Sequence, residues 1–339
     1  MKTRTPVTII TGMLGAGKTT LINNLLAKIS SEKIAIIINE FGNVGVDGTL
    51  LAENKQEDII ELTSGCICCT VMDDLIPIME RLLTQESAPD HIIIETSGLT
   101  LPKPLVQALR WPQMRSRVVL NGVIVIVDVF TILDLLDAKE AAFFETRKQI
   151  KGSFKHYSSL YKIFKDQLSC ADLIVLNKHE LLLDSSIENI DQLIKSEKKP
   201  GVQLIKSVHG NIPSELIMSN SIGVKNNIGV NHMDHNHDTH AHDEFKSVSV
   251  NIPSAINQQV VERVVAEVVK DYGILRVKGF AVIEGKSMRL IVQAVGPRVQ
   301  TYFDCHWTDL EQKKGYLVLI GQKGLDRGAI ASALHKALR

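Results

Sequence analysis

The sequence has 339 residues, 45% of them hydrophobic and 22% charged, a composition typical of a globular protein long enough for two domains with separate cores. Lysine plus arginine and aspartate plus glutamate number 38 each, so no overall positive charge favours a nucleic acid or an anionic membrane as partner. No apolar run reaches the roughly 18 residues of a membrane-spanning helix, and the few cysteines exclude a disulfide framework, so we expect a cytoplasmic protein.

The first expected elements are a strand over residues 7–10 and a helix over residues 21–29. The loop between them fits the phosphate-binding pattern G-x-x-x-x-G-K-[ST] at every fixed position. Glycines let successive backbone N–H groups curl round phosphate oxygens, and the helix that follows presents its positive end to the same anion. In this pattern Lys18 reaches the outer phosphates and the Thr19 hydroxyl holds Mg²⁺. The residues expected to contact the nucleotide are Gly12, Gly15, Ala16, Gly17, Lys18, Thr19 and Thr20.

Strands and helices are expected to alternate after the phosphate loop. Continuous apolar runs of strand length are typical of strands buried on both faces of a parallel sheet, and amphipathic stretches separate them. The pattern predicts an α/β fold, a P-loop NTPase domain with a mainly parallel sheet. The expected strands cover residues 33–39, 58–62, 91–94, 122–129, 173–176 and 202–205, with a helix over residues 71–83 despite Pro77.

Polar clusters follow almost every predicted strand. Ligands of an open α/β sheet bind outside the carboxyl ends of the strands. We therefore expect the phosphate loop, Glu40, the cysteine cluster, Glu95 and the pair Asn177-Lys178 to meet at one edge. This expectation requires the short strand over residues 58–62 to run parallel to its neighbours.

A glycine-rich polar segment follows the strand over residues 33–39. Asn39, Glu40 and Asp47 lie in this segment, which resembles the switch segments that become ordered around a γ-phosphate and Mg²⁺ and relax after hydrolysis. Two interpretations of Glu40 stay open: it is a metal ligand, or it is a solvated side chain in a turn.

Three of the five cysteines cluster at Cys66, Cys68 and Cys69. Thiolates are soft ligands whose mutual repulsion a cation neutralises, so Zn²⁺ is the expected occupant, with Cu(I) as an alternative. Because C-x-C-C is too tight for three sulfurs in one unstrained tetrahedron, we expect two thiolates plus Glu40 or a histidine. A redox pair and inert thiols stay open as other interpretations.

The composition changes over residues 219–244. Asparagine, serine, glycine and histidine dominate, and hardly any apolar side chain is present for a core, so we expect a His-rich flexible linker. Imidazoles alternating with carboxylates can capture Zn²⁺, Ni²⁺ or Co²⁺ without fixed geometry; a spacer with incidental affinity is the alternative. The candidate ligands are His232, His235, His237, His240 and His242.

A second unit begins near Phe245. A valine-rich amphipathic helix over residues 260–269 is followed by strands without helices between them, which predicts a smaller α+β domain whose antiparallel sheet carries helices on one face. The strands expected there cover residues 274–283, 288–294 and 316–320, and a helix over residues 327–338 ends the chain. The predicted parts are a P-loop domain over residues 1–218, the linker over 219–244 and the C-terminal domain over 245–339.

Motifs along nearly the whole chain occur in an order that resembles the CobW family of P-loop GTPases, whose relatives serve urease and hydrogenase maturation. They are GMLGAGKTT, NEFGNVGVDG, GCICCT, IIIETSG, the NK dipeptide, the His-rich linker, RVKGF and LVLIG. The CxCC cluster is the most discriminating, because very many NTPases share the phosphate loop. The resemblance implies a metal-handling chaperone that binds GTP and Mg²⁺.

The resemblance also implies roles for individual residues. Glu95 stands where many NTPases have the Walker B aspartate, and a carboxylate there can hold Mg²⁺ through water or orient the attacking water. The Thr-Ser-Gly turn that follows suits a γ-phosphate sensor, with Gly98 as its glycine. Lys18 and Glu95 are thus the expected catalytic residues, and an exposed acid at a strand end is the alternative for Glu95.

Asn177, Lys178 and Glu180 are expected to bind the base. GTPases of this kind carry NKxD, whose aspartate accepts two N–H bonds from guanine, whereas this sequence has NKHE. The extra methylene of Glu180 misplaces a bidentate pair at a cost of about 1 to 3 kcal/mol, so guanine preference is expected but weakened. Ser207, after the strand over residues 202–205, is expected in the second base-contacting loop.

The sequence therefore predicts a slow GTPase, since no arginine finger is evident, that binds Zn²⁺ or a similar ion at CxCC and delivers it to a client protein. Metal and nucleotide would bias the same loops reciprocally, and a homodimer is one expected assembly. Two alternatives stay open. One is a P-loop kinase or ATPase acting on a small metabolite, which Glu180 keeps open, and the other is a passive zinc-storage protein whose fold the nucleotide stabilises.

Overall fold

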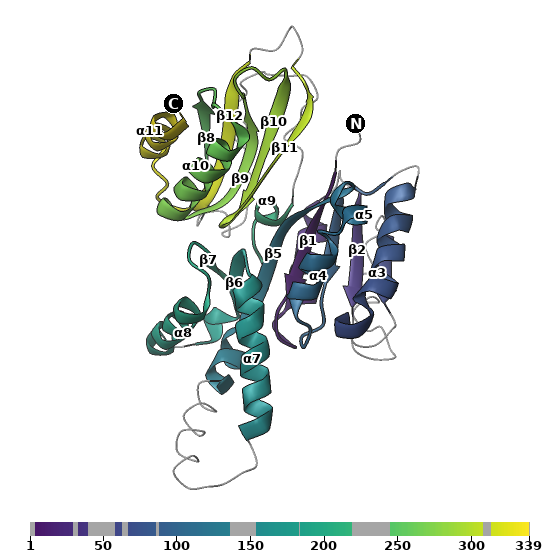
Figure 1. Ribbon diagram of the computed structural model, residues 1–339. Coiled ribbons are helices and arrows are strands. Elements are labelled where there is room, and N and C mark those ends of the chain that lie inside the picture. Colours follow the sequence, from purple (N-terminus) through teal and green to yellow (C-terminus); the bar gives the residue numbers. More distant parts are fainter. Residues whose placement is uncertain are drawn as a thin grey trace. The chain divides into compact units, whose positions relative to one another are not determined.

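The computed structural model describes residues 4–29, 33–39, 58–62, 67–85, 88–135, 154–182, 184–218, 245–307 and 313–338. The chain falls into two compact units, one over Arg4–Ile212 and the other from Pro213 onward (Figure 1). The second unit thus begins before the change in composition at residue 219. The linker over residues 219–244 lies outside the described residues, so its character stays a prediction.

The first unit contains a seven-stranded sheet in the order β3-β2-β4-β1-β5-β6-β7. Every neighbouring pair in it is parallel, including β2 and β3, so the expected direction of the short third strand is confirmed. Helices lie between β1 and β2 and between the consecutive strands from β3 to β7, which confirms the predicted α/β fold. The strands are β1 (Thr5–Thr11), β2 (Ile34–Asn39), β3 (Asp58–Leu62), β4 (His91–Glu95), β5 (Val118–Asp128), β6 (Leu173–Asn177) and β7 (Gln203–Ser207).

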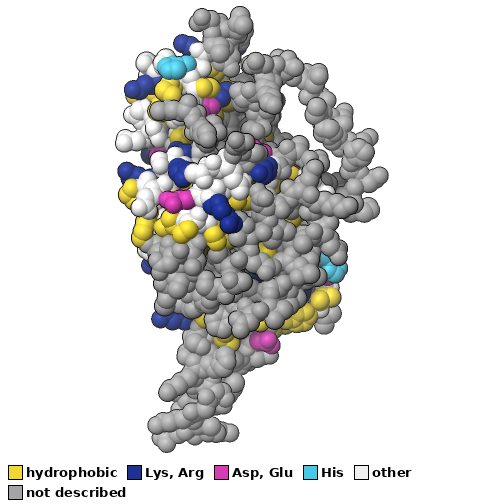
Figure 2. Space-filling model, turned by 90° about the vertical axis from the view of Figure 1, so that its right-hand side faces the viewer, with side chains coloured by type: hydrophobic (Ala, Val, Ile, Leu, Met, Phe, Trp, Pro, Cys, Tyr) yellow, Lys and Arg dark blue, Asp and Glu magenta, His cyan; other side chains and the backbone are white. Residues whose placement is uncertain are grey.

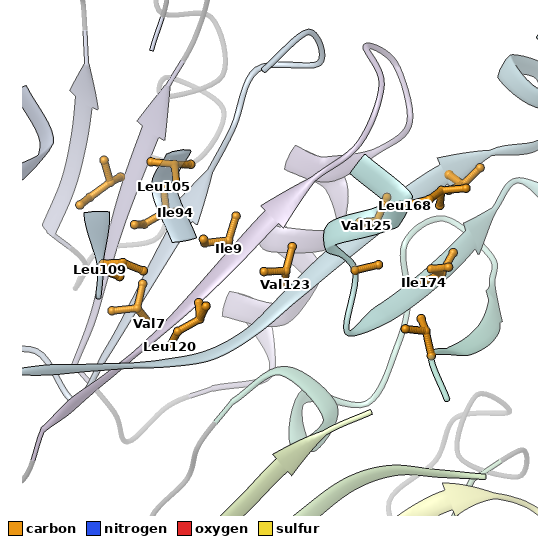
Figure 3. Packing of buried hydrophobic residues seen from close by; sticks show 14 of the residues in the cluster. Val7, Ile9, Ile94, Leu105, Leu109, Leu120, Val123, Val125, Leu168 and Ile174 are labelled. Carbon is orange, nitrogen blue, oxygen red and sulfur yellow. The ribbon is translucent and has the colours of Figure 1, made fainter. Parts of the chain in front are cut away.

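The central strands β1, β4, β5 and β6 are buried almost throughout, as their continuous apolar runs require. Figure 3 shows Val7 and Ile9 of β1 packing in one cluster with Leu105 of α4 and Leu168 of α7. This cluster anchors the strands from whose ends the polar loops project. The helices are α1 (Lys18–Ala27), α3 (Ile67–Thr84), α4 (Pro102–Ala108), α5 (Pro112–Arg115), α7 (Phe154–Cys170), α8 (Asp184–Glu197) and the 3-10 turn η1 (His179–Leu181).

Strand β5 begins earlier than its apolar run, which starts at residue 122. Asparagine usually disfavours strands, and Asn121 separates the predicted strand from the apolar residues 118–120 that begin β5. In the structure the Asn121 side chain donates from Nδ2 to the Thr8 hydroxyl at 2.8 Å. The pairing register between β1 and β5 shifts at this point, between Val7 and Thr8. The polar group is satisfied inside the sheet, so the strand continues through it.

The second unit is an antiparallel five-stranded sheet in the order β11-β10-β9-β12-β8. Helix α10 buries Val261, Val264, Val265, Val268 and Val269 in a core shared with β8, β9, β10 and α11, which confirms the predicted α+β layout. Its elements are α9 (Ser214–Ile217), β8 (Phe245–Ile252), α10 (Gln258–Asp271), β9 (Ile274–Ala281), β10 (Met288–Val295), β11 (Arg298–His306), β12 (Gly315–Gln322) and α11 (Arg327–Leu338).

On the part of the surface that is described in Figure 2, lysine and arginine side chains lie separately among uncharged ones. None of the helices in the described ranges combines the length and the apolar composition needed to cross a membrane.

Candidate functional site

The loop between β1 and α1 has a backbone that only glycine adopts easily. Gly12 has φ 146° and Gly17 has φ 97°, in the left-handed region that other residues rarely enter. A Cβ atom on Gly12 would lie 2.1 Å from the carbonyl oxygen of Ile126, and one on Gly17 would lie 2.5 Å from Nδ2 of Asn177. The two glycines therefore let the phosphate loop pass close to β5 and β6.

The Lys18 side chain lies folded over the phosphate loop. Its Nζ donates to the carbonyl oxygens of Gly12 at 3.1 Å and Met13 at 3.2 Å, and the residue is buried. Lys18 is also the first residue of α1, whose N-cap, Gly17, has no side chain to cap the helix. The loop thus holds an ammonium group beside a helix N-terminus, and both favour an anion.

Glu95 and Thr19 form the second part of this site. The Thr19 hydroxyl donates to Oε1 of Glu95 at 3.2 Å, which joins the start of α1 to the carboxyl end of β4. Glu95 is 3% exposed, so the alternative of an exposed acid at a strand end is wrong, and the functional role of Glu95 stays a prediction. Hydroxyl and carboxylate oxygens at this spacing are donors of the kind that Mg²⁺ takes at phosphate sites, so the residues present fit that ion.

The residues after Glu95 lie against the phosphate loop. The Thr96 backbone N–H donates to the carbonyl oxygen of Ile10 at 3.0 Å, and its hydroxyl donates to that of Thr11 at 2.8 Å. A Cβ atom on Gly98 would lie 2.3 Å from the backbone nitrogen of Leu14. The segment 95–100, which we call the sensor loop, is therefore in direct backbone contact with the phosphate loop.

Asn177 and Lys178, at the end of β6, hold the other side of the phosphate loop. Asn177 donates from Nδ2 to the carbonyl oxygen of Ala16 at 3.0 Å and accepts at Oδ1 from the Gly210 N–H at 3.0 Å. Lys178 donates from Nζ to the carbonyl oxygen of Gly15 at 2.9 Å. These contacts join the phosphate loop, the NK pair and the loop after β7 into one network.

Asp128 is a member of this network that sequence reasoning missed. It is 5% exposed at the end of β5. Its Oδ2 accepts from Nζ of Lys178 at 2.6 Å, and its Oδ1 accepts from the Phe130 N–H at 2.8 Å. An acid at the end of a buried strand is the signal that would have found it, the same signal that singled out Glu95.

Glu180 lies in the 3-10 turn η1, exposed at the surface. Its neighbour His179 is within hydrogen-bonding distance of the Ser207 carbonyl oxygen, 3.2 Å from Nδ1, and 3.8 Å separates the same nitrogen from Oε2 of Glu180. The NKHE segment and the loop that begins at Ser207 are therefore adjacent, as two loops that contact one base would have to be.

The expected metal ligands fall mostly outside the described residues, and these are Glu40, Cys66, His232, His235, His237, His240 and His242. Cys68 and Cys69 lie in the first turn of α3, which begins at Ile67. Two of the three clustered cysteines are thus in a helix and not in a loop as expected, because the helix starts before residue 71. Within the described ranges, no three His, Cys, Asp or Glu residues form a group that could hold a metal ion.

The strands that precede the CxCC segment and the phosphate loop end at the same edge of the sheet. The CxCC segment follows the carboxyl end of β3, and the phosphate loop follows that of β1. Only β2 and β4 lie between these strands, and all four are parallel. Three strand spacings correspond to roughly 14 Å. The carboxyl ends of β2, which precedes Glu40 in the sequence, and of β4, whose last residue is Glu95, lie between those of β3 and β1.

Both units of the chain are similar to known proteins. Residues 6–204 match the CobW/HypB/UreG nucleotide-binding domain, and residues 245–338 match the cobalamin synthesis protein cobW C-terminal domain. The chain is 40% identical to a zinc chaperone CobW of Sinorhizobium sp, covering 97% of this chain and 96% of the relative. It is 39% identical to a zinc chaperone CobW of Pseudomonas aeruginosa, covering 100% and 93%. It is 29% identical to a zinc-regulated GTPase metalloprotein activator 1 of Dictyostelium discoideum, covering 64% and 48%.

Proposed function

The chain belongs to the CobW/HypB/UreG family, and from this premise we propose that it is a GTP-hydrolysing zinc chaperone of the cytoplasm. The observation that carries the proposal is the shared sheet edge: the phosphate loop, the sensor loop and the CxCC segment all follow the carboxyl ends of parallel strands. The names of the similar proteins, zinc chaperone and zinc-regulated GTPase metalloprotein activator, support the two halves of the activity.

GTP binds with its phosphates on the backbone of the phosphate loop. Lys18 leaves the carbonyl groups of Gly12 and Met13 and pairs with the outer phosphates, because a charged oxygen forms a stronger hydrogen bond with an ammonium group than a neutral carbonyl does. Asn177 and Lys178 shape the same loop through Ala16 and Gly15, so base binding and phosphate binding share one network.

Hydrolysis takes place between the phosphate loop and Glu95. The Thr19 hydroxyl and, through water, Glu95 would hold Mg²⁺, which would supply positive charge beside the phosphates. The Glu95 carboxylate orients a water molecule, whose oxygen forms the new bond to the γ-phosphorus while the bond to the bridging oxygen of GDP breaks. The reaction is slow, because the described contacts of the phosphate loop include no arginine to stabilise the transition-state charge.

Zinc is the cargo, held by thiolates of the CxCC segment. Cys68 and Cys69 lie in the first turn of α3, and the positive end of a helix favours the thiolate form that binds metal. The donor set in this proposal consists of two of the three thiolates of Cys66, Cys68 and Cys69, together with Glu40 or a histidine. Zn²⁺ suits such sulfur-rich sites, and Co²⁺ or Ni²⁺ are the other ions that thiolates with a carboxylate or imidazole accept.

Nucleotide state controls the release of zinc in this proposal. Hydrolysis relaxes the segment that begins at Glu40, which starts between the cysteines and the phosphate loop on the sheet edge. The linker histidines His232, His235, His237, His240 and His242 hold ions upstream of the cysteines, and the C-terminal domain holds part of the client. Because coupling is reciprocal, a GTP-dependent zinc affinity requires a zinc-dependent GTP affinity of the same factor.

Changing Glu180 to Asp is expected to strengthen the preference for GTP over ATP and over inosine triphosphate about tenfold, because a shorter carboxylate restores the bidentate bond to guanine. Competitive binding of GTP, ATP and inosine triphosphate checks this prediction. Phosphate release from each nucleotide is the second readout. Ser169→Ala, an exposed change on α7, is the control. A wild-type protein that binds ATP more tightly than GTP would contradict the GTPase proposal and favour the kinase or ATPase alternative.

A further inference from the structure

A buried glutamine on α7 contacts the sensor loop. Gln167 is 0% exposed, and its Nε2 donates to the carbonyl oxygens of Gly98 at 3.2 Å and Thr100 at 3.4 Å. On the same helix, Phe164 and Leu168 are buried in the core of the first unit. The amide group thus extends from a packed helix to Gly98 and Thr100, which follow Ser97 in the sensor loop.

The contact lies directly behind the point where the sensor loop touches the phosphate loop. Gly98 approaches the backbone of Leu14 so closely that a Cβ atom would be 2.3 Å from its nitrogen, while the Gly98 carbonyl oxygen accepts from Gln167. Gly98 is therefore held between the phosphate loop and α7. A displacement of the sensor loop would have to break one of these two contacts.

The other atom of the same amide group is left unsatisfied. Oε1 of Gln167 is buried and has no hydrogen-bond partner in the described chain. A buried polar atom without a hydrogen-bond partner lowers the stability of the fold. Most buried polar atoms are paired, so an unpaired one calls for an explanation. An apolar side chain of the same length would avoid this cost, so what the amide group contributes at this position is the two bonds that its Nε2 makes.

We propose that Gln167 is a positioning residue that holds the sensor loop against the phosphate loop, so that the loop is ready to meet a γ-phosphate. The inference rests on the proposed GTPase function and deepens it. A loop that is already ordered loses less conformational entropy on binding its ligand. GTP benefits from this order and GDP does not, because GDP has no γ-phosphate for the sensor loop to contact. Gln167 therefore sets the preference for GTP over GDP.

The test replaces Gln167 with Met, which has similar length and no donor. Dissociation constants for a non-hydrolysable GTP analogue and for GDP are measured by calorimetry, together with the unfolding midpoint. The matched control is Gln203→Met, which removes a comparable side-chain bond to a backbone carbonyl, that of Gly201 at 3.3 Å. We expect the dissociation constant for the GTP analogue to rise roughly threefold to tenfold, as for the loss of one or two hydrogen bonds, with that for GDP nearly unchanged.

A structural role alone would lower the unfolding midpoint and change both dissociation constants by the same factor, and this result overturns the inference. An unchanged or increased preference for the GTP analogue overturns it as well. If the Met variant does not fold, Gln167→Asn keeps an amide group that is one methylene too short to reach both carbonyls, and the same ratio is measured. A wild-type protein that binds neither nucleotide overturns the proposed function itself, which separates that failure from a failure confined to Gln167.

Discussion

Replacing Glu95 with Gln is expected to lower kcat for GTP hydrolysis about 100-fold to 1,000-fold, the usual effect of removing a group that stabilises the transition state. Glutamine keeps the shape of the side chain and can still accept the bond from the Thr19 hydroxyl at Oε1. It lacks the charge that, in the proposed mechanism, holds Mg²⁺ and orients the attacking water. Because these interactions act on the γ-phosphate, GDP affinity is expected to stay within about threefold of wild type.

Single-turnover phosphate release and GDP calorimetry measure the two quantities separately. Glu197→Gln is the matched control, since Glu197 accepts from the Tyr161 hydroxyl at 2.7 Å and pairs with Lys165 at 3.0 Å on the helix pair α7 and α8. Its hydrolysis rate should equal that of wild type. A Glu95→Gln variant that hydrolyses GTP at the wild-type rate would show that another group positions the water, and the proposed role of Glu95 would be wrong.

Replacing Cys66, Cys68 and Cys69 together with Ser is expected to weaken zinc binding at least about 100-fold, because even outer-shell changes at metal sites cost about 10-fold to 100-fold and these residues include the proposed ligands themselves. Hydroxyl groups are poor substitutes for thiolates at neutral pH. The linker histidines should still bind zinc weakly, so a second, low-affinity phase is expected to survive. Any dependence of zinc affinity on the bound nucleotide should disappear with the cysteines.

Competition against a chromophoric zinc chelator measures both phases. The control is the double variant Cys170→Ser and Cys305→Ser, which removes two free thiols elsewhere in the chain and should leave the tight phase intact. If the triple variant keeps the tight phase and the control loses it, the site lies outside the CxCC segment.

Much of the fold follows from local pattern. Strand β3 and helix α11 have the bounds predicted for them, because an apolar run and an amphipathic repeat are each interrupted sharply by polar residues. The phosphate loop was equally predictable, since its glycines are required by backbone geometry that no other residue adopts easily. The predicted family resemblance is confirmed by matches to both of its domains.

The features that sequence reasoning missed depend on long-range contacts. Strand β11 is half-buried along most of its length, so no alternation of apolar and polar residues marks it. Asp128 and Gln167 gain their importance from Lys178 and the Gly98 carbonyl, partners distant in the chain. The local sequence does not reveal the role of such a side chain, because its hydrogen-bond partner becomes a neighbour only in the folded protein.

The account depends on zinc and nucleotide influencing each other through a common sheet edge. Zinc titration of the wild-type protein with a GTP analogue, with GDP and without nucleotide tests this most directly. We expect zinc affinity to differ at least about fivefold between the analogue and GDP, the lower end of typical coupling between sites. The affinity for the analogue should change by the same factor when zinc is added. Identical zinc affinities in all three titrations would contradict the account and would favour the alternative of a passive zinc-storage protein.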